Sequence, residues 1–346
     1  MQHKGYFHRV SEQTATRFWI NNVTKEEARL AIEAGAVGCT QNPAYTWKML
    51  CRDELKPQLD KKIVAYLRQG LASNDIEVHL QRDMVKEIAE IFLPIYEQSN
   101  RKNGYVSIQG DPFHEDTETI VRCAVFNHEA APNIMAKIPA TEEGLRAIEQ
   151  VAALGIPINA TEVMAVRQAL DVCEVYEKAT KGLKDKAPIY FSHITGIFDE
   201  YLKKQAEEKQ IDISPDALWQ AGMVIAKKTY HMARQHNIEV GFISGGARGL
   251  HHFTEMVGAD ANVTINWKGT ADKLLEQDPP VVQRFFMPVA DNVLEELCQK
   301  LPDFRRGYFS CAIQPSEYED FGPVKLFRES FEEAWSKALA YIDSLR

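Results

Sequence analysis

One lysine near the middle of the chain stands at the end of a short apolar segment. Residues 133–141 read Asn-Ile-Met-Ala-Lys-Ile-Pro-Ala-Thr, which predicts a strand closed by Pro139 and a helix that begins at Thr141. Because strand residues alternate sides, Lys137 shares a face with Met135 and is expected to point inward. Burial would lower the pKa of Lys137, and a neutral amine can attack a carbonyl to form a Schiff base. Taken alone, a strand-end lysine whose ammonium group reaches solvent or a carboxylate is the commoner case.

Strand and helix signals alternate along the chain and predict the elements that position this lysine. A capping box of Thr24 and Glu27 and a Ser214-Pro215 helix start mark two of the predicted helices. The predicted strands are 17–23, 36–40, 105–109, 133–138, 157–161, 188–192, 239–244 and 261–267. Eight strand-helix units favour an α/β fold of the (β/α)₈ TIM-barrel type over a doubly wound sheet, which spacing alone does not exclude.

The rest of the chain is expected to decorate this barrel. Helical spacing over residues 55–100 predicts extra helices inserted after the second strand, and the region 162–178 after the fifth strand predicts a helix. A helical tail over residues 288–346 is expected to pack outside the barrel. Residues 1–346 are therefore predicted to form a single barrel domain, with residues 1–13 as a polar lead-in.

Hydrogen-bonding side chains stand at nearly every predicted strand end. They are Asn21, Gln41, Asn42, Gln109, Asn159, Thr161, Ser192, His193, Ser244 and Asn266. Each alone is more often a turn former, but the C-terminal strand ends of a barrel form its active face. An amine among neutral hydrogen-bonding groups suits imine chemistry on a polyhydroxylated carbonyl compound.

A glycine-rich turn follows the seventh strand. Ser244-Gly245-Gly246-Ala247-Arg248-Gly249 could present backbone N–H groups to a phosphate, and Arg248 could add a bidentate contact. A tight turn with a surface arginine is an equally good interpretation.

Metal and cofactor chemistry is less well supported. His128-Glu129 lacks the second histidine of a zincin motif, and His251 and His252 are adjacent, so their side chains are expected to diverge on a helix. His193 could act as a proton shuttle, although a structural histidine is the commoner case. We expect neither a metal nor a cofactor.

Composition limits the partners and the compartment. The formal net charge is −9 and no Lys/Arg run is interleaved with aromatics, which argues against nucleic acid. No apolar stretch has membrane-spanning length, and the six cysteines are scattered, so reduced thiols in a cytoplasmic protein are expected. The expected partner is a small molecule, with no membrane; homo-oligomerisation stays open.

Several motifs together resemble the transaldolase family, including its fructose-6-phosphate aldolase branch. The resemblance runs from Phe18 to Trp335, and its motifs are Gly38-Cys39-Thr40-Gln41-Asn42-Pro43, Val106-Ser107-Ile108, Lys137-Ile138-Pro139-Ala140-Thr141 and Gly155-Ile156-Pro157-Ile158-Asn159-Ala160-Thr161. It implies a transferase that passes a dihydroxyacetone unit from a ketose phosphate to an aldose, as in the pentose phosphate pathway.

The resemblance also implies roles for individual residues. Lys137 would form the imine, and Asn42 and Asn159 would hold the Schiff base or substrate hydroxyls. Thr161, with Gln109, would position a catalytic water, and Ser192 would contact the substrate.

Three departures separate this sequence from the family pattern. Asn21 stands where the family has the aspartate that takes a proton during carbon-carbon cleavage, and an amide cannot do this. Gln109 replaces a glutamate, as in the aldolase branch, whose tyrosine base is Ile194 here. Ile197 replaces the arginine that binds phosphate.

These departures leave alternatives to a transaldolase. His193 is a candidate replacement base, and Ser244 with Arg248 a candidate anion site. The chain could instead be an aldolase or lyase for another sugar, or a carbohydrate-binding homologue with weakened catalysis.

Overall fold

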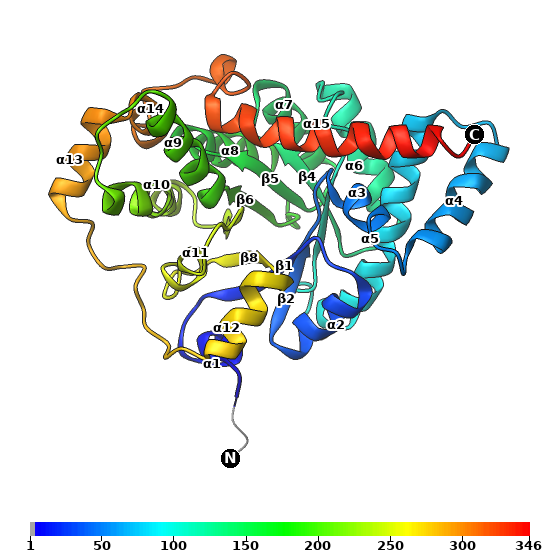
Figure 1. Cartoon of the computed structure of the whole chain (residues 1–346), viewed down its shortest axis with the longest axis horizontal. Helices are drawn as coiled ribbons and strands as arrows, with labels where there is room; N and C mark the ends of the chain where they lie inside the picture. Colours follow the sequence, from blue (N-terminus) through cyan, green and yellow to red (C-terminus); the bar gives the residue numbers. More distant parts are fainter. Residues whose placement is uncertain (1–3) are drawn as a thin grey trace.

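Eight parallel strands close into a barrel in chain order in the computed structural model, which describes residues 4–346 (Figure 1). Strand β1 pairs with β2 on one side and with β8 on the other, and this last pairing closes the ring. The strands are β1 Arg17–Asn21, β2 Ala36–Thr40, β3 Val106–Gln109, β4 Ile134–Pro139, β5 Ile158–Val163, β6 Ile189–His193, β7 Gly241–Ser244 and β8 Asn262–Asn266. The predicted (β/α)₈ barrel is confirmed.

Helices surround the barrel, and further helices precede β1 and follow β8. Those up to β5 are α1 Tyr6–Gln13, α2 Lys25–Glu33, α3 Tyr45–Leu50, α4 Lys56–Arg68, α5 Ser73–Gln98, α6 Thr117–His128 and α7 Glu142–Ala153. After β5 come α8 Val166–Ala179, α9 Thr195–Glu208, α10 Pro215–His236, α11 His251–Thr254, η1 Trp267–Ala271, α12 Asp272–Gln277, α13 Asp291–Lys300, α14 Pro302–Tyr308, η2 Pro315–Glu317 and α15 Gly322–Asp343. Helices α4 and α5 lie between β2 and β3, where extra helices were predicted.

Local signals set several helix starts as predicted. The Thr24 hydroxyl accepts from the Glu27 backbone N–H while the Glu27 carboxylate accepts from Thr24 N–H, which completes the capping box of α2. Ser214 caps α10 ahead of Pro215. Thr141 caps α7 by accepting from Gly144 N–H, so the backbone leaves the lysine-bearing strand in a defined direction.

Two predicted boundaries were wrong. The supposed polar lead-in contains α1, which buries Tyr6 and Phe7 and stacks Phe7 on Phe18 with ring centroids 4.0 Å apart. The helix expected over 162–178 begins only at Val166, because β5 continues through Glu162 to Val163. Glu162 is therefore a strand residue.

The two faces of β4 pack as its alternation predicts. Ile134, Ala136 and Ile138 belong to the large core between strands and helices. Met135 packs instead in a separate small cluster with Trp19 and Ile243, which lies inside the barrel. Because Lys137 is two residues from Met135, its side chain enters the barrel interior above this cluster.

The helical tail packs outside the barrel, and its last helix, α15, crosses one end of the barrel. Helix α15 runs across the top of the molecule in Figure 1 and contacts α3, α5, α9 and β5. It buries Phe331, Trp335 and Ile342. This helix therefore covers the end of the barrel where the strand C-termini lie.

Candidate active site

Lys137 is the buried amine at the centre of the site. Its side chain is 7 % exposed, and its Nζ lies 5.9 Å from the centroid of the Phe331 ring of α15. Burial lowers the pKa of Lys137 from 10.5 to about 8, and the negative charge of Glu162 opposes part of this shift. A substantial fraction of the amine is therefore neutral near pH 8, as nucleophilic attack requires.

A cavity of about 360 Å³ opens beside this amine at the C-terminal ends of the strands. Six of the strand-end and loop residues identified from sequence line it: Asn21, Asn42, Lys137, Ser192, Arg248 and Asn266. Sequence reasoning missed several other lining residues, among them Lys48, Phe327, Ser330 and Phe331. The last three belong to α15, and nothing in their local sequence distinguishes them from core residues of an ordinary helix.

A chain of neutral hydrogen bonds occupies the wall formed by β1, β2 and β8. Asn21 donates to the Asn266 side-chain oxygen over 3.1 Å and accepts from the Thr40 hydroxyl over 3.0 Å. The Thr40 hydroxyl also lies 2.7 Å from that of Thr264. This wall presents amides and hydroxyls to the cavity and contains no carboxylate among these four residues.

The neighbouring wall joins β1 to the loop after β2. Asn22 donates from its side chain to Asn42 Oδ1 over 3.0 Å, and its own Oδ1 accepts from Asn42 N–H over 3.1 Å. Lys48 donates to the Asn22 carbonyl over 2.7 Å, and burial lowers the pKa of Lys48. Asn42 is thus held rigidly at the cavity, beside a second cationic side chain.

A polar layer adjoins the lysine on β5. Asn159 lies in register with Lys137, donates to the Ser107 hydroxyl over 3.1 Å and accepts from the Ser192 hydroxyl over 2.7 Å. These contacts fix the amide orientation, so Asn159 can hold a hydroxyl or an imine near Lys137 without reorganising.

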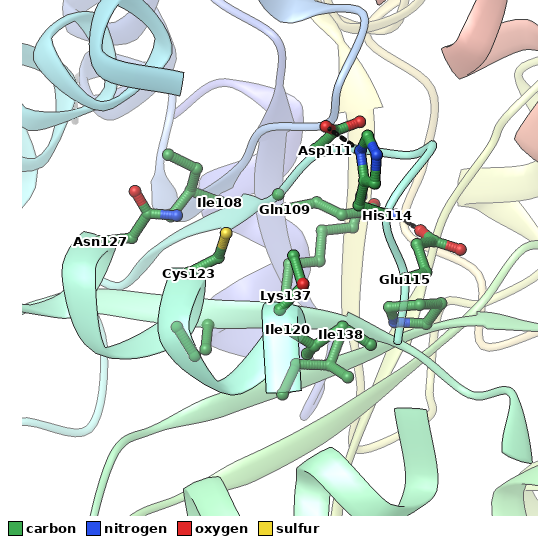
Figure 2. Close-up of a pocket in the computed structure, with 15 residues that line it drawn as sticks. Ile108, Gln109, Asp111, His114, Glu115, Ile120, Cys123, Asn127, Lys137 and Ile138 are labelled. Carbon is green, nitrogen blue, oxygen red and sulfur yellow. Dashed lines mark hydrogen bonds and ion pairs between the residues drawn. The ribbon is translucent and has the colours of Figure 1, made fainter. Parts of the chain in front are cut away.

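Buried acidic groups gather at the ends of β3 and β5. Gln109 donates from Nε2 to Glu162 Oε1 over 2.9 Å, with a longer contact of 3.4 Å to Glu115 Oε1. Gln109, Glu115 and Lys137 lie together in Figure 2. Sequence reasoning missed Glu162 and Glu115; a glutamate directly after Thr161 in an apolar strand was the available signal. The site therefore does contain carboxyl groups, on Glu162 and Glu115.

His193 and Ser244 do not belong to the cavity wall. Ser192 lines the cavity, so the next residue on β6, His193, turns to the other face, where its Nδ1 lies 3.1 Å from the Thr195 hydroxyl. Burial lowers the pKa of His193 to about 3, so the imidazole is neutral. Ser244 also contacts the Thr195 hydroxyl, at 3.1 Å. These positions do not favour His193 as a replacement base or Ser244 as an anion ligand.

The glycine-rich turn after β7 has already used most of the N–H groups expected to bind phosphate. Gly245 N–H donates to the His193 carbonyl, and the N–H groups of Arg248 and Gly249 donate to His252 Nδ1. The Arg248 guanidinium pairs with Glu200 at 2.5 Å, and both side chains are half exposed. Arg248 lies at the cavity but is partly neutralised, so the predicted anion site is weaker than its sequence indicated.

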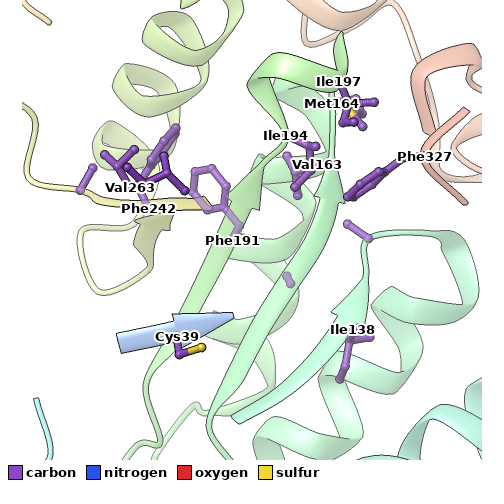
Figure 3. Packing of buried hydrophobic residues seen from close by; sticks show 14 of the residues in the cluster. Cys39, Ile138, Val163, Met164, Phe191, Ile194, Ile197, Phe242, Val263 and Phe327 are labelled. Carbon is purple, nitrogen blue, oxygen red and sulfur yellow. The ribbon is translucent and has the colours of Figure 1, made fainter. Parts of the chain in front are cut away.

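An apolar cluster surrounds Ile197, the residue that the resemblance matches to a phosphate-binding arginine. Ile197 is buried, and Figure 3 shows it with Met164, Val163, Ile194 and Phe327. Ile194 and Phe327 also line the cavity. One side of the cavity is therefore hydrophobic.

The two adjacent histidines converge, contrary to the sequence expectation. Their ring centroids are 4.0 Å apart, and both rings approach Asp199. His252 is fully engaged: its Nδ1 accepts from the turn and its Nε2 lies 2.8 Å from Asp199 Oδ2. This arrangement holds the glycine-rich turn in place.

The C-terminal ends of the strands surround a desolvated lysine at a polar cavity. This combination of fold and site is that of an enzyme-like barrel with a reactive amine. Residues 18–300 match the family model described as Transaldolase/Fructose-6-phosphate aldolase, and the chain belongs to this family. Among residues 4–346, no helix is long and apolar enough to cross a membrane.

Curated relatives agree with this family assignment. Transaldolase 2 of Nostoc punctiforme is 33% identical over 184 residues, 51% of this chain and 47% of the relative. A transaldolase of Trichodesmium erythraeum is 28% identical over 220 residues, 57% of each chain, and one of Saccharopolyspora erythraea is 32% identical over 167 residues, 46% of this chain and 44% of the relative. The chain spans about half the length of these relatives.

Proposed function

We propose that this protein is a transaldolase-type enzyme that uses Lys137 as a Schiff-base nucleophile. The donor would be a ketose phosphate whose C2 carbonyl receives the amine, and a dihydroxyacetone unit would pass to an aldose acceptor in cytoplasmic sugar-phosphate metabolism. The observation that carries the proposal is the burial of Lys137, with a pKa of about 8, at a cavity rich in amides and hydroxyls.

Each wall of the cavity has a part in this reaction. The Lys137 amine adds to the carbonyl, and Asn42, Asn159 and Ser192 hold the hydroxyls of the sugar or the nitrogen of the imine. Gln109 and Thr161 would orient two waters: the one that leaves when the imine forms and the one that later hydrolyses it. Cleavage of the C3–C4 bond also needs a group that removes the C4 hydroxyl proton, and Asn21 at the family position cannot supply it.

A second candidate substrate lacks the phosphate. Ile194, Ile197 and Phe327 make one side of the cavity apolar, and Arg248 is paired with Glu200. These contacts favour an aldolase or lyase for an unphosphorylated ketone over phosphate recognition. The neutral Asn21 favours, more weakly, a carbohydrate-binding protein with little turnover.

Borohydride trapping tests these functions directly. The protein is incubated with fructose 6-phosphate or with free dihydroxyacetone, reduced, and analysed by intact mass and peptide mapping. We expect a reduced adduct on Lys137 that is absent from Lys137→Met, whereas Lys48→Met, which removes the other lysine of the cavity, keeps it. If fructose 6-phosphate and dihydroxyacetone give adduct equally well at the same concentration, the phosphate contributes nothing to binding. That result would favour the unphosphorylated substrate. No adduct on folded protein would overturn the Schiff-base function.

A further inference from the structure

Glu162 has an unusual backbone conformation at the end of β5. Its φ is +61°, in the left-handed region that a non-glycine residue rarely adopts, and its side chain is fully buried. The pairing of β5 with β6 shifts register between Ala160 and Val163, so Glu162 lies in a bulge. Such strain is concentrated at functional sites, where bulges re-aim side chains.

The bulge directs the Glu162 carboxyl group toward the lysine-bearing strand. Gln109 on β3 is in register with Lys137 on β4, and Lys137 is in register with Asn159 on β5. The hydrogen bond of 2.9 Å from Gln109 to Glu162 therefore joins the two strands that flank β4 and spans the end of the strand that carries Lys137.

Three buried polar atoms around the Gln109–Glu162 hydrogen bond can still form hydrogen bonds. Gln109 Oε1, Thr161 Oγ1 and Glu162 Oε2 are buried, and none has a hydrogen-bond partner within residues 4–346. Buried polar atoms are rarely left without partners, so three such atoms together mark a place where a water or a substrate hydroxyl binds.

Charged groups on several elements determine the protonation of Glu162. Arg328 of α15 acts electrostatically on Glu162 and lies 3.0 Å from Glu115 Oε2; Glu319 before α15 and Lys137 on β4 also act on the site. Burial raises the pKa of the Glu162 carboxyl group, while Arg328, the hydrogen bond from Gln109 and Lys137 oppose the rise. A carboxyl group in these surroundings can hold and release a proton nearer to neutral pH than an exposed glutamate.

We propose that Glu162 is the acid–base carboxyl group for imine formation at Lys137 and replaces the carboxylate absent at position 109. This inference rests on the proposed Schiff-base function. The chain has moved the carboxyl group from β3 to β5 and retains Gln109 as the donor that holds it. Glu162 thus meets the adduct directly, beside the free polar atoms of Gln109 and Thr161.

The proton balance of the step is explicit. The Lys137 nitrogen bonds to the ketone carbon, and its proton passes to the oxygen to give a carbinolamine. Protonated Glu162 then gives its proton to the carbinolamine hydroxyl, the C–O bond breaks, and water leaves. The iminium ion and the Glu162 carboxylate remain as an ion pair, and hydrolysis reverses each transfer.

The substitution Glu162→Gln separates this role from a structural one. A glutamine side-chain oxygen still accepts from Gln109 Nε2, so the bridge persists, while the ionisable proton is lost. Glu77→Gln is the matched control, because Glu77 is also fully buried, with a pKa raised by burial to about 8, and is not among the residues that line the Lys137 cavity. Gln109→Glu combined with Glu162→Gln returns a carboxyl group to β3.

The measurement is the rate of adduct formation with dihydroxyacetone, quenched by borohydride at timed intervals from about pH 6 to about pH 10. We expect Glu162→Gln to slow the maximal rate on the order of 100-fold and to remove the fall in rate at high pH that deprotonation of Glu162 causes. The negative charge of Glu162 raises the pKa of Lys137, so Glu162→Gln should lower this pKa. The rise in rate that follows deprotonation of Lys137 should then occur at lower pH. The double variant should recover part of the rate, and Glu77→Gln should match the wild type.

The outcomes distinguish this inference from the function on which it rests. No adduct in the wild type removes the Schiff-base function itself. A wild-type adduct with an unchanged rate and pH profile in Glu162→Gln overturns only the role of Glu162. A slower rate with an unchanged profile, and without recovery in the double variant, assigns Glu162 a structural role and also overturns the inference.

Discussion

At the scale of single residues, the cost of burying Lys137 predicts a measurable effect on stability. The unfolded chain keeps this lysine protonated up to pH 10.5, whereas the folded protein does so only up to about pH 8. The penalty is therefore complete below pH 8 and disappears as the pH rises from 8 to 10.5. We expect Lys137→Met to raise the free energy of unfolding at pH 7 by about 2 to 3 kcal/mol, with little gain above pH 10, as measured by urea unfolding. Equal gains at both pH values would contradict a buried amine.

Asn21 yields a second prediction at this scale. Asn21→Asp supplies a carboxylate beside Thr40, and the Asn266 amide can rotate to donate to it. If the site lacks only a base for carbon-carbon cleavage, the turnover of fructose 6-phosphate with an aldose acceptor should rise at least about 10-fold. Asn21→Ala, which adds no base, is the control. An unchanged rate in Asn21→Asp would show that the substitution at position 21 is not what limits transfer.

At the scale of elements, helix α15 keeps water away from the amine. Phe331 lies over Lys137, and its removal should let water reach Nζ and raise the pKa of Lys137 toward 10.5. Phe331→Ala should therefore shift the midpoint of the pH dependence of trapping upward by about one unit and slow trapping at pH 7 about tenfold.

A second residue of α15 is the control for this effect. Trp335 is buried on the same helix and donates to Asn74 Oδ1 over 2.8 Å, but it is not among the residues that line the cavity. Trp335→Phe keeps most of the packing and should leave the midpoint unchanged. If both variants shift the midpoint equally, the effect belongs to general loosening of the helix and not to cover over the amine.

At the scale of the whole molecule, Arg328 couples the C-terminal tail to the barrel electrostatically. It is the guanidinium beside the buried Glu115, and it lowers the otherwise raised pKa values of both Glu115 and Glu162. Arg328→Met should cost about 3 to 5 kcal/mol of unfolding free energy at pH 8, because the buried Glu115–Glu162 pair loses the cation that compensates its negative charge. A buried acid whose pKa is raised by folding destabilises the folded protein most when the pH is above that pKa, where the acid is ionised. The loss of unfolding free energy in Arg328→Met should therefore shrink as the pH falls toward 5.

Urea unfolding at both pH values checks the Arg328 prediction against a matched variant. Lys325 lies on the same helix, is exposed and pairs with Asp320 at 3.4 Å. Lys325→Met should change the unfolding free energy by less than about 1 kcal/mol at either pH. A loss in Arg328→Met that does not depend on pH would indicate lost packing and not lost charge compensation.

The sequence by itself determined the features that depend on near neighbours in the chain. Alternation along residues 134–138 placed Lys137 on the inner face of its strand, and Thr24 with Glu27 started a helix as their side chains require. The repeat of strand and helix then led to a barrel, because parallel strands joined by helices have few ways to bury both faces.

Only the tertiary structure decided which strand-end groups meet. A change of one residue at a strand end reverses the face, so Ser192 lines the cavity while His193 does not. Glu162 joins the site through a bulge and a bond to Gln109, which is 53 residues away, and Arg328 reaches it from a helix near the C-terminus. Such contacts leave no periodic signal in the sequence. They arise only when the closed barrel brings the C-terminal ends of β3 and β5 together beneath α15.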